Sequence, residues 1–139
     1  MIRLSANLGF LWPDRALPDR IDAAARAGFR AIELHWPYDV PASQVREACR
    51  RNGLTLLGLN TPVGDAAAGE FGLGALPGRE RDFRDAFARS LDYAREAGAS
   101  AIHVMAGGVA PGAEAWRWAA TAPPPVHRST AAAPGSRRA

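Results

Sequence analysis

"ARAGFRAIEL", residues 25–34, runs from a helix-like pattern through a glycine directly into an apolar, strand-like pattern. The same arrangement returns in "CRRNGLTLLGL" (49–59) and in "AREAGASAIHV" (94–104), each with arginine in the last helical turn. Glycine favours the left-handed conformation just past a helix end, and a cation near that end opposes the helix dipole. The three segments therefore predict three successive junctions from a helix into a strand.

Extending these junctions outward defines the whole order of elements. We expect helices at 18–27, 41–52 and 80–97, the first two opening at Pro18 and Pro41, and strands at 2–7, 30–36, 54–60 and 100–106. Proline is favoured in a first helical turn. No short turn signal joins two of the expected strands, so helical crossovers connect them and the sheet is parallel. This order suits either a doubly wound sheet or part of a (β/α)₈ barrel.

Strand alternation separates an apolar face from a partly polar one. The apolar face is expected to hold Ile2, Leu4, Ala6, Ile32, Leu34, Trp36, Leu57, Leu59, Ile102 and Val104. The opposite face gathers polar groups toward the carboxyl ends of the strands: Asn7, Glu33, His35, Asn60 and His103. An open sheet covered by helices on both sides needs two apolar faces. The pattern therefore favours a partial (β/α)₈ TIM barrel of the α/β class, with about four parallel strands and three to four helices.

A long glycine-rich connection, "NTPVGDAAAGEFGLGALPGRE" at residues 60–80, interrupts the repeat. Gly28 and Gly53 are 25 residues apart, whereas Gly53 and Gly98 are 45 apart, so the third unit carries about 20 extra residues. They fall between a strand and the following helix, at the carboxyl end of the sheet where barrel enzymes build their sites. We interpret the stretch as a lid over a pocket.

Length and composition describe one ordinary domain. The chain has 139 residues, of which 47% are hydrophobic, and no apolar run approaches the roughly 18 residues of a membrane helix. The N-terminal "MIRLSANLGFLWPD" lacks the charged and apolar regions of a signal peptide. The single cysteine, Cys49, excludes an internal disulfide and lies beside Val45 on a helix, which predicts a core position. A reducing, cytoplasmic location fits best.

The basic character of the chain is confined to its last part. Residues 1–111 hold 13 arginines and 13 acidic residues, whereas residues 112–139 hold four arginines and one glutamate and so supply the whole net charge of +3. Binding of phosphate backbones needs clustered cations, which the balanced part of the chain does not offer. We therefore expect neither nucleic acid nor a membrane among the partners.

Each polar candidate also has a purely structural interpretation. Glu33 is either a buried acid paired with Arg3 or a ligand for substrate, and His35 and His103 are either hydrogen-bonded core residues or ligands. "WPYD" at 36–39 is either a turn or an apolar wall at the end of a strand, and the glycines of "GVAPG" at 108–112 are only a weak anion-binding signal. The face of the sheet on which a side chain is expected does not decide between these alternatives.

Three stretches resemble the hydroxypyruvate isomerase family within the xylose isomerase-like TIM barrels. They are "RLSANLGFLW" (3–12), "AGFRAIELHWPYD" (27–39) and the loop pattern N-x-P-x-G-D-x-x-x-G-E-x-G followed by P-G-R-E (60–80), and the likeness extends from residue 1 to about 115. The resemblance implies that hydroxypyruvate is converted to tartronate semialdehyde, or a related small keto acid is isomerised. It also implies an enediol intermediate and a divalent cation, Mg²⁺ or Mn²⁺, that holds the enediolate.

The resemblance also assigns residues. Asn7, Tyr38, Asn60 and Glu70 match the substrate-binding side of the family's site, whereas Glu33 and His103 join them as substrate-binding candidates by their facing alone. The family's acid and base glutamates and its metal ligands come mainly from later strands, so no catalytic residue or metal ligand is assigned here. A complete barrel takes about 250 residues. We therefore expect this chain to supply roughly the first half of the barrel and to be inactive or impaired as an enzyme.

The resemblance ends near residue 116, which divides the chain into a half-barrel at 1–115 and a tail at 116–139. "WRWAATAPPPVHRSTAAAPGSRRA" is rich in proline, alanine and arginine and has no sustained helical stripe. We expect an irregular or disordered tail, and a frameshifted reading frame is one hypothesis for its origin. Unpaired edges at the first and last strands would favour self-association. A non-enzymatic half-barrel that acts as an interaction module, and an apurinic endonuclease, stay as alternative functions.

Overall fold

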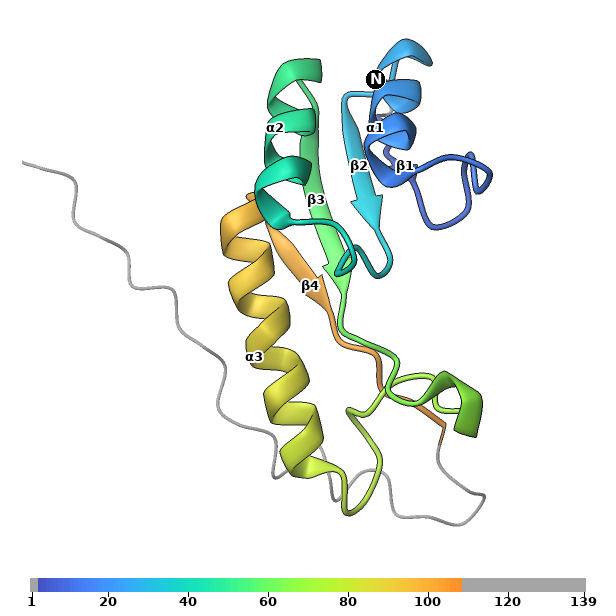
Figure 1. Ribbon diagram of the computed structural model, residues 1–139, viewed down its shortest axis with the longest axis vertical. Coiled ribbons are helices and arrows are strands. Elements are labelled where there is room, and N and C mark those ends of the chain that lie inside the picture. The colour runs from blue at the N-terminus through green and yellow to red at the C-terminus, as the bar shows by residue number, and fades with distance from the viewer. Residues whose placement is uncertain (1–2, 109–139) are drawn as a thin grey trace, which may run out of the picture.

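The computed structural model describes residues 3–108, and its elements follow the predicted order (Figure 1). The strands are β1 (Ala6–Asn7), β2 (Ala31–Leu34), β3 (Thr55–Asn60) and β4 (Ala101–His103), and the helices are α1 (Leu17–Arg26), α2 (Ala42–Asn52) and α3 (Glu80–Ala97), with a short 3₁₀ turn, η1 (Ala66–Ala68). Each helix begins and ends within one residue of its expected position. The tail at 116–139, a fourth helix and most of "GVAPG" lie outside the described residues.

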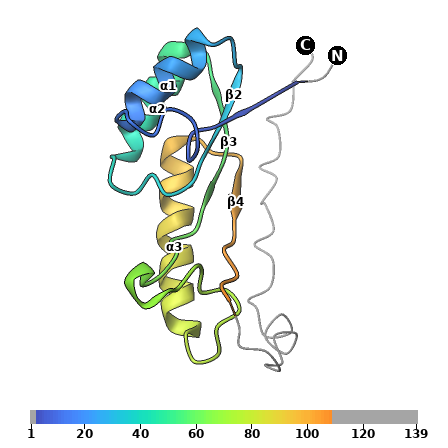
Figure 2. The same ribbon diagram turned by 90° about the vertical axis from the view of Figure 1, so that its right-hand side faces the viewer.

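The four strands form one parallel sheet in the order β1-β2-β3-β4, so each strand lies beside its neighbour in sequence. All three helices lie on the same side of this sheet (Figure 2). A doubly wound sheet would place helices on both faces. Sequential parallel strands with helices on one side are instead the arrangement of a barrel wall. Within residues 3–108, no helix is long and apolar enough to cross a membrane.

The helix-to-strand junctions form as their glycines predict. Gly53 and Gly98 end α2 and α3 with φ angles of 62° and 82°, in the left-handed region that residues with a side chain rarely adopt. The backbone N–H of Leu54 then donates to the carbonyl of Cys49. These caps turn the chain back toward the sheet after each helix.

The main core lies between the sheet and the helices. Its fully buried side chains include Ile32, Leu34 and Leu59 from the strands and Ile21 and Val45 from the helices. Cys49 is also buried there, as predicted. A second, smaller cluster joins Leu73 of the long connection to Phe83 and Ala86 of α3. The long connection therefore has an apolar anchor of its own.

A β-bulge in β3 corrects the predicted faces of this strand. Ile32 pairs with Leu56 but the next residue, Glu33, pairs with Gly58, so Leu57 is an extra residue on β3. A bulge of this kind shifts the side-chain alternation by one position. Leu56 is consequently 3% exposed in the core and Leu57 is 37% exposed on the opposite face, the reverse of the prediction.

The ends of the outer strands are also shorter than predicted. The chain pairs as β1 only at Ala6–Asn7, and Leu4 is 70% exposed instead of lying on the core face. β4 ends at His103, after which Val104 is 40% exposed instead of lying in the core, whereas Met105 is buried at the cavity, on the face expected for it. Alternation holds only where a strand is paired, and these residues lie outside the paired segments.

Candidate functional site

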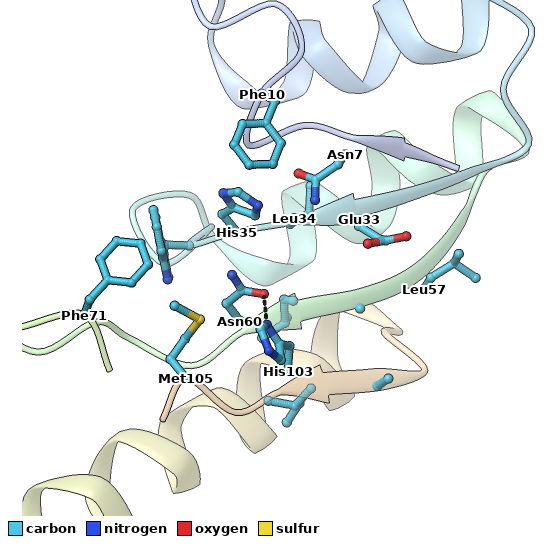
Figure 3. Close-up of a pocket in the computed structure, with 15 residues that line it drawn as sticks. Asn7, Phe10, Glu33, Leu34, His35, Leu57, Asn60, Phe71, His103 and Met105 are labelled. Atoms are coloured by element: carbon cyan, nitrogen blue, oxygen red, sulfur yellow. Dashed lines mark hydrogen bonds between the residues drawn. The ribbon is translucent and has the colours of Figure 1, made fainter. Parts of the chain in front are cut away.

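A cavity of about 550 Å³ lies at the carboxyl ends of all four strands (Figure 3). Fifteen residues line it: Asn7, Phe10, Glu33, Leu34, His35, Trp36, Leu57, Gly58, Leu59, Asn60, Phe71, Ala101, Ile102, His103 and Met105. Four of the six predicted substrate-binding residues, namely Asn7, Glu33, Asn60 and His103, are therefore brought together. A volume of several hundred Å³ is typical of pockets for small molecules.

Two polar side chains on the side of the cavity formed by β1 and β2 are held by hydrogen bonds. Asn7 Oδ1 accepts from the backbone N–H of Gly9 at 2.9 Å, which fixes the turn after β1. The Ser5 hydroxyl donates to Glu33 Oε1 at 2.6 Å. Among residues 3–108 no ion pair joins Glu33 to Arg3, so the structural alternative for this carboxylate takes the form of a hydroxyl contact.

On the β3–β4 side, His103 Nδ1 lies 3.3 Å from Asn60 Oδ1 (Figure 3). An amide oxygen only accepts hydrogen bonds, so the proton of a neutral His103 belongs on Nδ1 in this arrangement. Nε2 then keeps a lone pair with which it can accept a proton or a hydrogen bond. The Asn60 backbone N–H donates to the carbonyl of His35 at 2.9 Å, so the ends of β2 and β3 are joined at the cavity.

A row of four rings forms one wall of the cavity. The ring centroids are 4.6 Å apart for Phe10 and His35, 5.1 Å for His35 and Trp36, and 5.9 Å for Trp36 and Phe71. Phe10 and Phe71 were not predicted as site residues. Their signal in the sequence is their place in the loops that follow β1 and β3, because such loops meet at the carboxyl edge of a parallel sheet. Trp36, which was predicted on the core face, is instead 39% exposed at the cavity, where it supplies the apolar wall that "WPYD" suggested.

Glycine at position 9 lets His35 join this row. A Cβ atom built on Gly9 would lie 2.1 Å from His35 Nδ1, far inside any permitted contact. The imidazole therefore packs directly against the backbone of the β1–α1 loop. This close approach, together with the edge-on Phe10 ring, fixes the direction in which His35 faces.

Tyr38 does not line the cavity. Its hydroxyl donates to the backbone carbonyl of Asn60 and lies 2.8 Å from the Ser90 hydroxyl of α3. Its ring also packs edge-on against Tyr93. Burial raises the pKa of the Tyr38 phenol above its ordinary value. Tyr38 thus lies in the layer between the sheet and α3, from which it can act on the site only through the backbone of β3.

Glu70 does not line the cavity either. Its carboxylate forms an ion pair with Arg79 and accepts a hydrogen bond from the backbone N–H of Asp65. The neighbouring residue, Phe71, is the one that reaches the cavity. The structure therefore separates the six predicted residues into four at the cavity and two, Tyr38 and Glu70, that support the segments around it.

The described residues do not fit a metal centre. No group of three or more His, Cys, Asp and Glu side chains within residues 3–108 is arranged to hold an ion. Glu33, His35 and His103 all line the cavity, but they are not arranged as such a group. The divalent cation implied by the resemblance therefore receives no ligand set from this part of the chain.

Comparison with known proteins agrees with the architecture and with the family resemblance. The family model of the xylose isomerase-like TIM barrel matches residues 21–123. The 2-oxo-tetronate isomerase of Cupriavidus necator is 47% identical over 121 residues, covering 87% of this chain and 46% of that protein. The hydroxypyruvate isomerase of Escherichia coli is 39% identical over 107 residues, covering 77% of this chain and 42% of that protein.

A solved structure gives the same result in three dimensions. The protein described as an AP endonuclease, family 2, from Brucella melitensis superimposes with a TM-score of 0.73 at 37% identity, covering 77% of this chain and 42% of that one. The chain thus spans less than half the length of each of these relatives. The four-stranded sheet with helices on one side corresponds to part of a barrel. The chain belongs to the xylose isomerase-like TIM barrel family.

Proposed function

We propose that residues 3–108 form the substrate-binding wall of an isomerase that acts on small hydroxy keto acids. The reaction is the conversion of hydroxypyruvate to tartronate semialdehyde, or the matching shift in a 2-oxo-tetronate, through an enediol. The observation that carries the proposal is the meeting of Asn7, Asn60 and His103 in one cavity at the carboxyl ends of the strands. The names of the relatives support an isomerase, and their two substrates share a carbonyl beside a hydroxyl-bearing carbon.

The chemistry of the cavity suits such a substrate. In an enediol shift a proton leaves one carbon and returns to its neighbour, so both oxygens must stay held while the charge moves between them. The side-chain amides of Asn7 and Asn60 can donate to those oxygens, and His103 offers a nitrogen beside Asn60. The row of rings from Phe10 to Phe71 limits the access of water on one side. Glutamates that move the proton are expected outside the described residues.

A coupled assay tests this proposal. The chain is incubated with hydroxypyruvate or 2-oxo-tetronate, with Mg²⁺ or Mn²⁺ added, and product is measured by a reductase-linked change in absorbance. Any turnover should fall at least about tenfold in Asn60→Ala, because the loss of a hydrogen bond to a charged intermediate removes well over 1 kcal/mol. Asn52→Ala, at the end of α2, serves as the control for loss of an asparagine amide, because this amide donates to Asp22 of α1 and does not line the cavity. Absence of turnover with every substrate and metal would favour the alternative of a non-enzymatic interaction module.

A DNA-repair function is the second candidate, because the solved relative from Brucella melitensis is described as an AP endonuclease. The charge balance argues against it, since residues 1–111 hold 13 arginines and 13 acidic residues. No arginine lines the described cavity. Salt-sensitive binding to a duplex with an abasic site would support this candidate over the isomerase.

A further inference from the structure

The long connection between β3 and α3 is fastened to the segment that follows β4. The backbone N–H groups of Gly74 and Ala75 donate to the carbonyls of Met105 and Ala106 at 3.1 and 2.7 Å. Gly72 forms an isolated antiparallel bridge with Ala106, and its own N–H donates to the carbonyl of Val63 at 2.7 Å. The two segments therefore run side by side beyond the ends of their strands, as Figure 1 shows.

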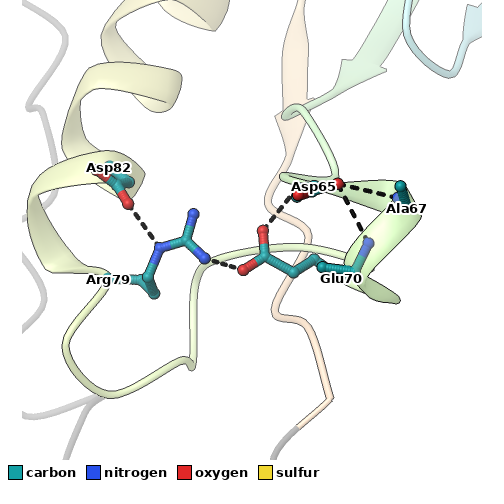
Figure 4. A network of polar contacts seen from close by, with 6 residues as sticks. Asp65, Ala67, Glu70, Arg79 and Asp82 are labelled. Atoms are coloured by element: carbon teal, nitrogen blue, oxygen red, sulfur yellow. Dashed lines mark hydrogen bonds and ion pairs between the residues drawn. The ribbon is translucent and has the colours of Figure 1, made fainter.

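A network of charged side chains also joins the beginning of this connection, near η1, to its end at the start of α3 (Figure 4). Glu70 Oε1 pairs with Arg79, and Glu70 Oε2 accepts from the backbone N–H of Asp65 at 2.6 Å. Arg79 in turn donates from Nε to Asp82 Oδ2 at 2.6 Å. The Glu70 side chain is 14% exposed and that of Arg79 is 35% exposed, so the pair is partly withdrawn from water. One carboxylate thus joins η1 to the start of α3.

The backbone is shaped to receive this carboxylate. A Cβ atom on Gly64 would lie 2.2 Å from Glu70 Oε2, so only glycine leaves room for it. Asp65 Oδ1 accepts from the N–H groups of Ala67 and Ala68 at 3.0 and 3.2 Å and caps the turn of η1. The position of Glu70 is therefore determined by several independent contacts, and its side chain is directed away from the cavity.

Phe71 lies between these two fastenings. Glu70 precedes it and is held by the ion pair, and Gly72 follows it and is held by the bridge to Ala106. The Phe71 side chain itself is 61% exposed and has one aromatic neighbour, the Trp36 ring at 5.9 Å. A residue that is mostly exposed is held only weakly by its own packing, so the place of Phe71 at the cavity depends on the residues on either side.

We propose that the Glu70–Arg79 ion pair is a clasp that places Phe71 at the rim of the cavity, which makes Glu70 and Arg79 positioning residues and Phe71 a determinant of substrate size. The clasp itself is a property of the fold, whereas its effect on substrate rests on the proposed isomerase function. Hydrogen exchange and fluorescence test the clasp, and enzyme kinetics test its effect on substrate.

Hydrogen exchange tests the clasp without any assay of activity. In Glu70→Gln we expect the amide protons of Gly72, Gly74 and Ala75 to exchange about tenfold faster or more, because a charge-assisted bond is lost. The matched control is Glu47→Gln, which removes a fully surface ion pair with Arg50 on α2. Exchange at these three amides that equals the wild-type rate in Glu70→Gln would overturn the clasp.

Tryptophan fluorescence tests the position of Phe71. Trp36 is isolated by replacing Trp12, Trp116 and Trp118 with phenylalanine, and acrylamide quenching is compared between that background and the same background with Glu70→Gln. We expect stronger quenching of Trp36 when the clasp is lost, and no change with Glu47→Gln. Unchanged quenching alongside faster exchange would show that Phe71 is placed by other contacts, and would overturn the proposed link.

Kinetics test the effect on substrate. Phe71→Ala and Glu70→Gln are both expected to raise KM for hydroxypyruvate several-fold with little change in kcat, because they alter the rim and not the reacting groups. A fall in kcat at constant KM would contradict a role in shaping the rim. If the wild-type chain shows no turnover at all, the proposed function fails, while exchange and fluorescence still decide whether the clasp exists.

Discussion

The Tyr38 hydroxyl lies 2.8 Å from the hydroxyl of Ser90, which joins the loop after β2 to the middle of α3. The same Tyr38 hydroxyl donates to the backbone carbonyl of Asn60, the last residue of β3. Ser90 is fully buried and itself donates to the carbonyl of Ala86. A substrate-binding candidate is thus part of a buried polar contact that holds the end of β3, from which the Asn60 side chain reaches the cavity.

Tyr38→Phe should therefore lower stability more than it affects substrate binding. Removal of the hydroxyl leaves the Ser90 hydroxyl and the Asn60 carbonyl without this partner, which we expect to reduce the free energy of unfolding by about 1–2 kcal/mol. Urea denaturation measures the change. A KM that rises more than tenfold at unchanged stability would instead place Tyr38 in contact with substrate.

The bulge in β3 predicts opposite behaviour for two adjacent leucines. Leu56→Ala opens a cavity in the core and is expected to reduce the free energy of unfolding by about 2–5 kcal/mol. Leu57→Ala, on the exposed side, should reduce it by less than about 1 kcal/mol. The two variants serve as controls for each other in thermal or urea unfolding. Equal losses would contradict the shifted pairing between β2 and β3.

Gly9→Ala should displace His35 without unfolding the chain. The new methyl group would occupy the place of the imidazole ring, so His35 must rotate away from Phe10, at an expected loss of about 1–3 kcal/mol. The measurement is the NMR chemical shift of the His35 ring protons, which now lie near the edge of an aromatic ring. Gly108→Ala is the matched control, because a Cβ atom there meets nothing within 4 Å. Unchanged His35 shifts would show that the close packing does not exist in solution.

Burial raises the pKa of the Cys49 thiol to about 11. The folded chain therefore keeps a proton on Cys49 that the unfolded chain releases above about pH 8.5. The resulting stability is fully present below that pH and is lost as the pH rises toward 11, so the free energy of unfolding should fall over this window. Cys49→Ala should flatten that part of the profile.

Thiol chemistry gives a second check on Cys49. A buried, protonated thiol reacts slowly, since the thiolate is the nucleophile. We expect modification by a disulfide reagent at pH 8 to be much slower in the folded chain than in urea. Rapid modification without denaturant would contradict the core position of Cys49.

We propose that the outer edges of β1 and β4 cause copies of the chain to associate. Within residues 3–108 neither edge is paired with another strand of the sheet, and unpaired edges are templates for pairing with another chain. We expect the 139-residue chain to associate as its concentration rises, measured by sedimentation velocity. A monomer at all concentrations with a sharp unfolding transition at high temperature would count against this.

The junctions from helix to strand were predictable from the sequence because the residues that determine them are neighbours in the chain. Gly53 and Gly98 mark helix ends through a backbone conformation that other residues avoid, and the helices before them follow directly. The cavity was predictable to the extent that Asn7, Asn60 and His103 each end a strand, because parallel strands present these ends at one edge. Both inferences depend on neighbours in the chain.

What the sequence analysis missed depends on contacts that the pattern of each single strand or loop does not display. The extra residue at Leu57 arises from the pairing of β3 with β2, and Gly58 in "TLLGLN" is the local mark of a bulge, which strict alternation overlooked. The resemblance assigned Tyr38 and Glu70 to the site, but their polar groups contact Ser90 and Arg79 instead of facing the cavity. Phe71 was overlooked because an exposed aromatic residue in a glycine-rich loop carries no periodic signal.

The tie between the loop after β3 and the segment after β4 also has a consequence for the folding order. The bridge from Gly72 to Ala106 and the bond from the Met105 N–H to the Thr61 hydroxyl both require that α3 has already brought β4 alongside β3. The helices and their caps need no such help. During synthesis on the ribosome, the ligand-facing edge of this domain should accordingly be the last portion to acquire its native shape, after residue 106 has left the exit tunnel.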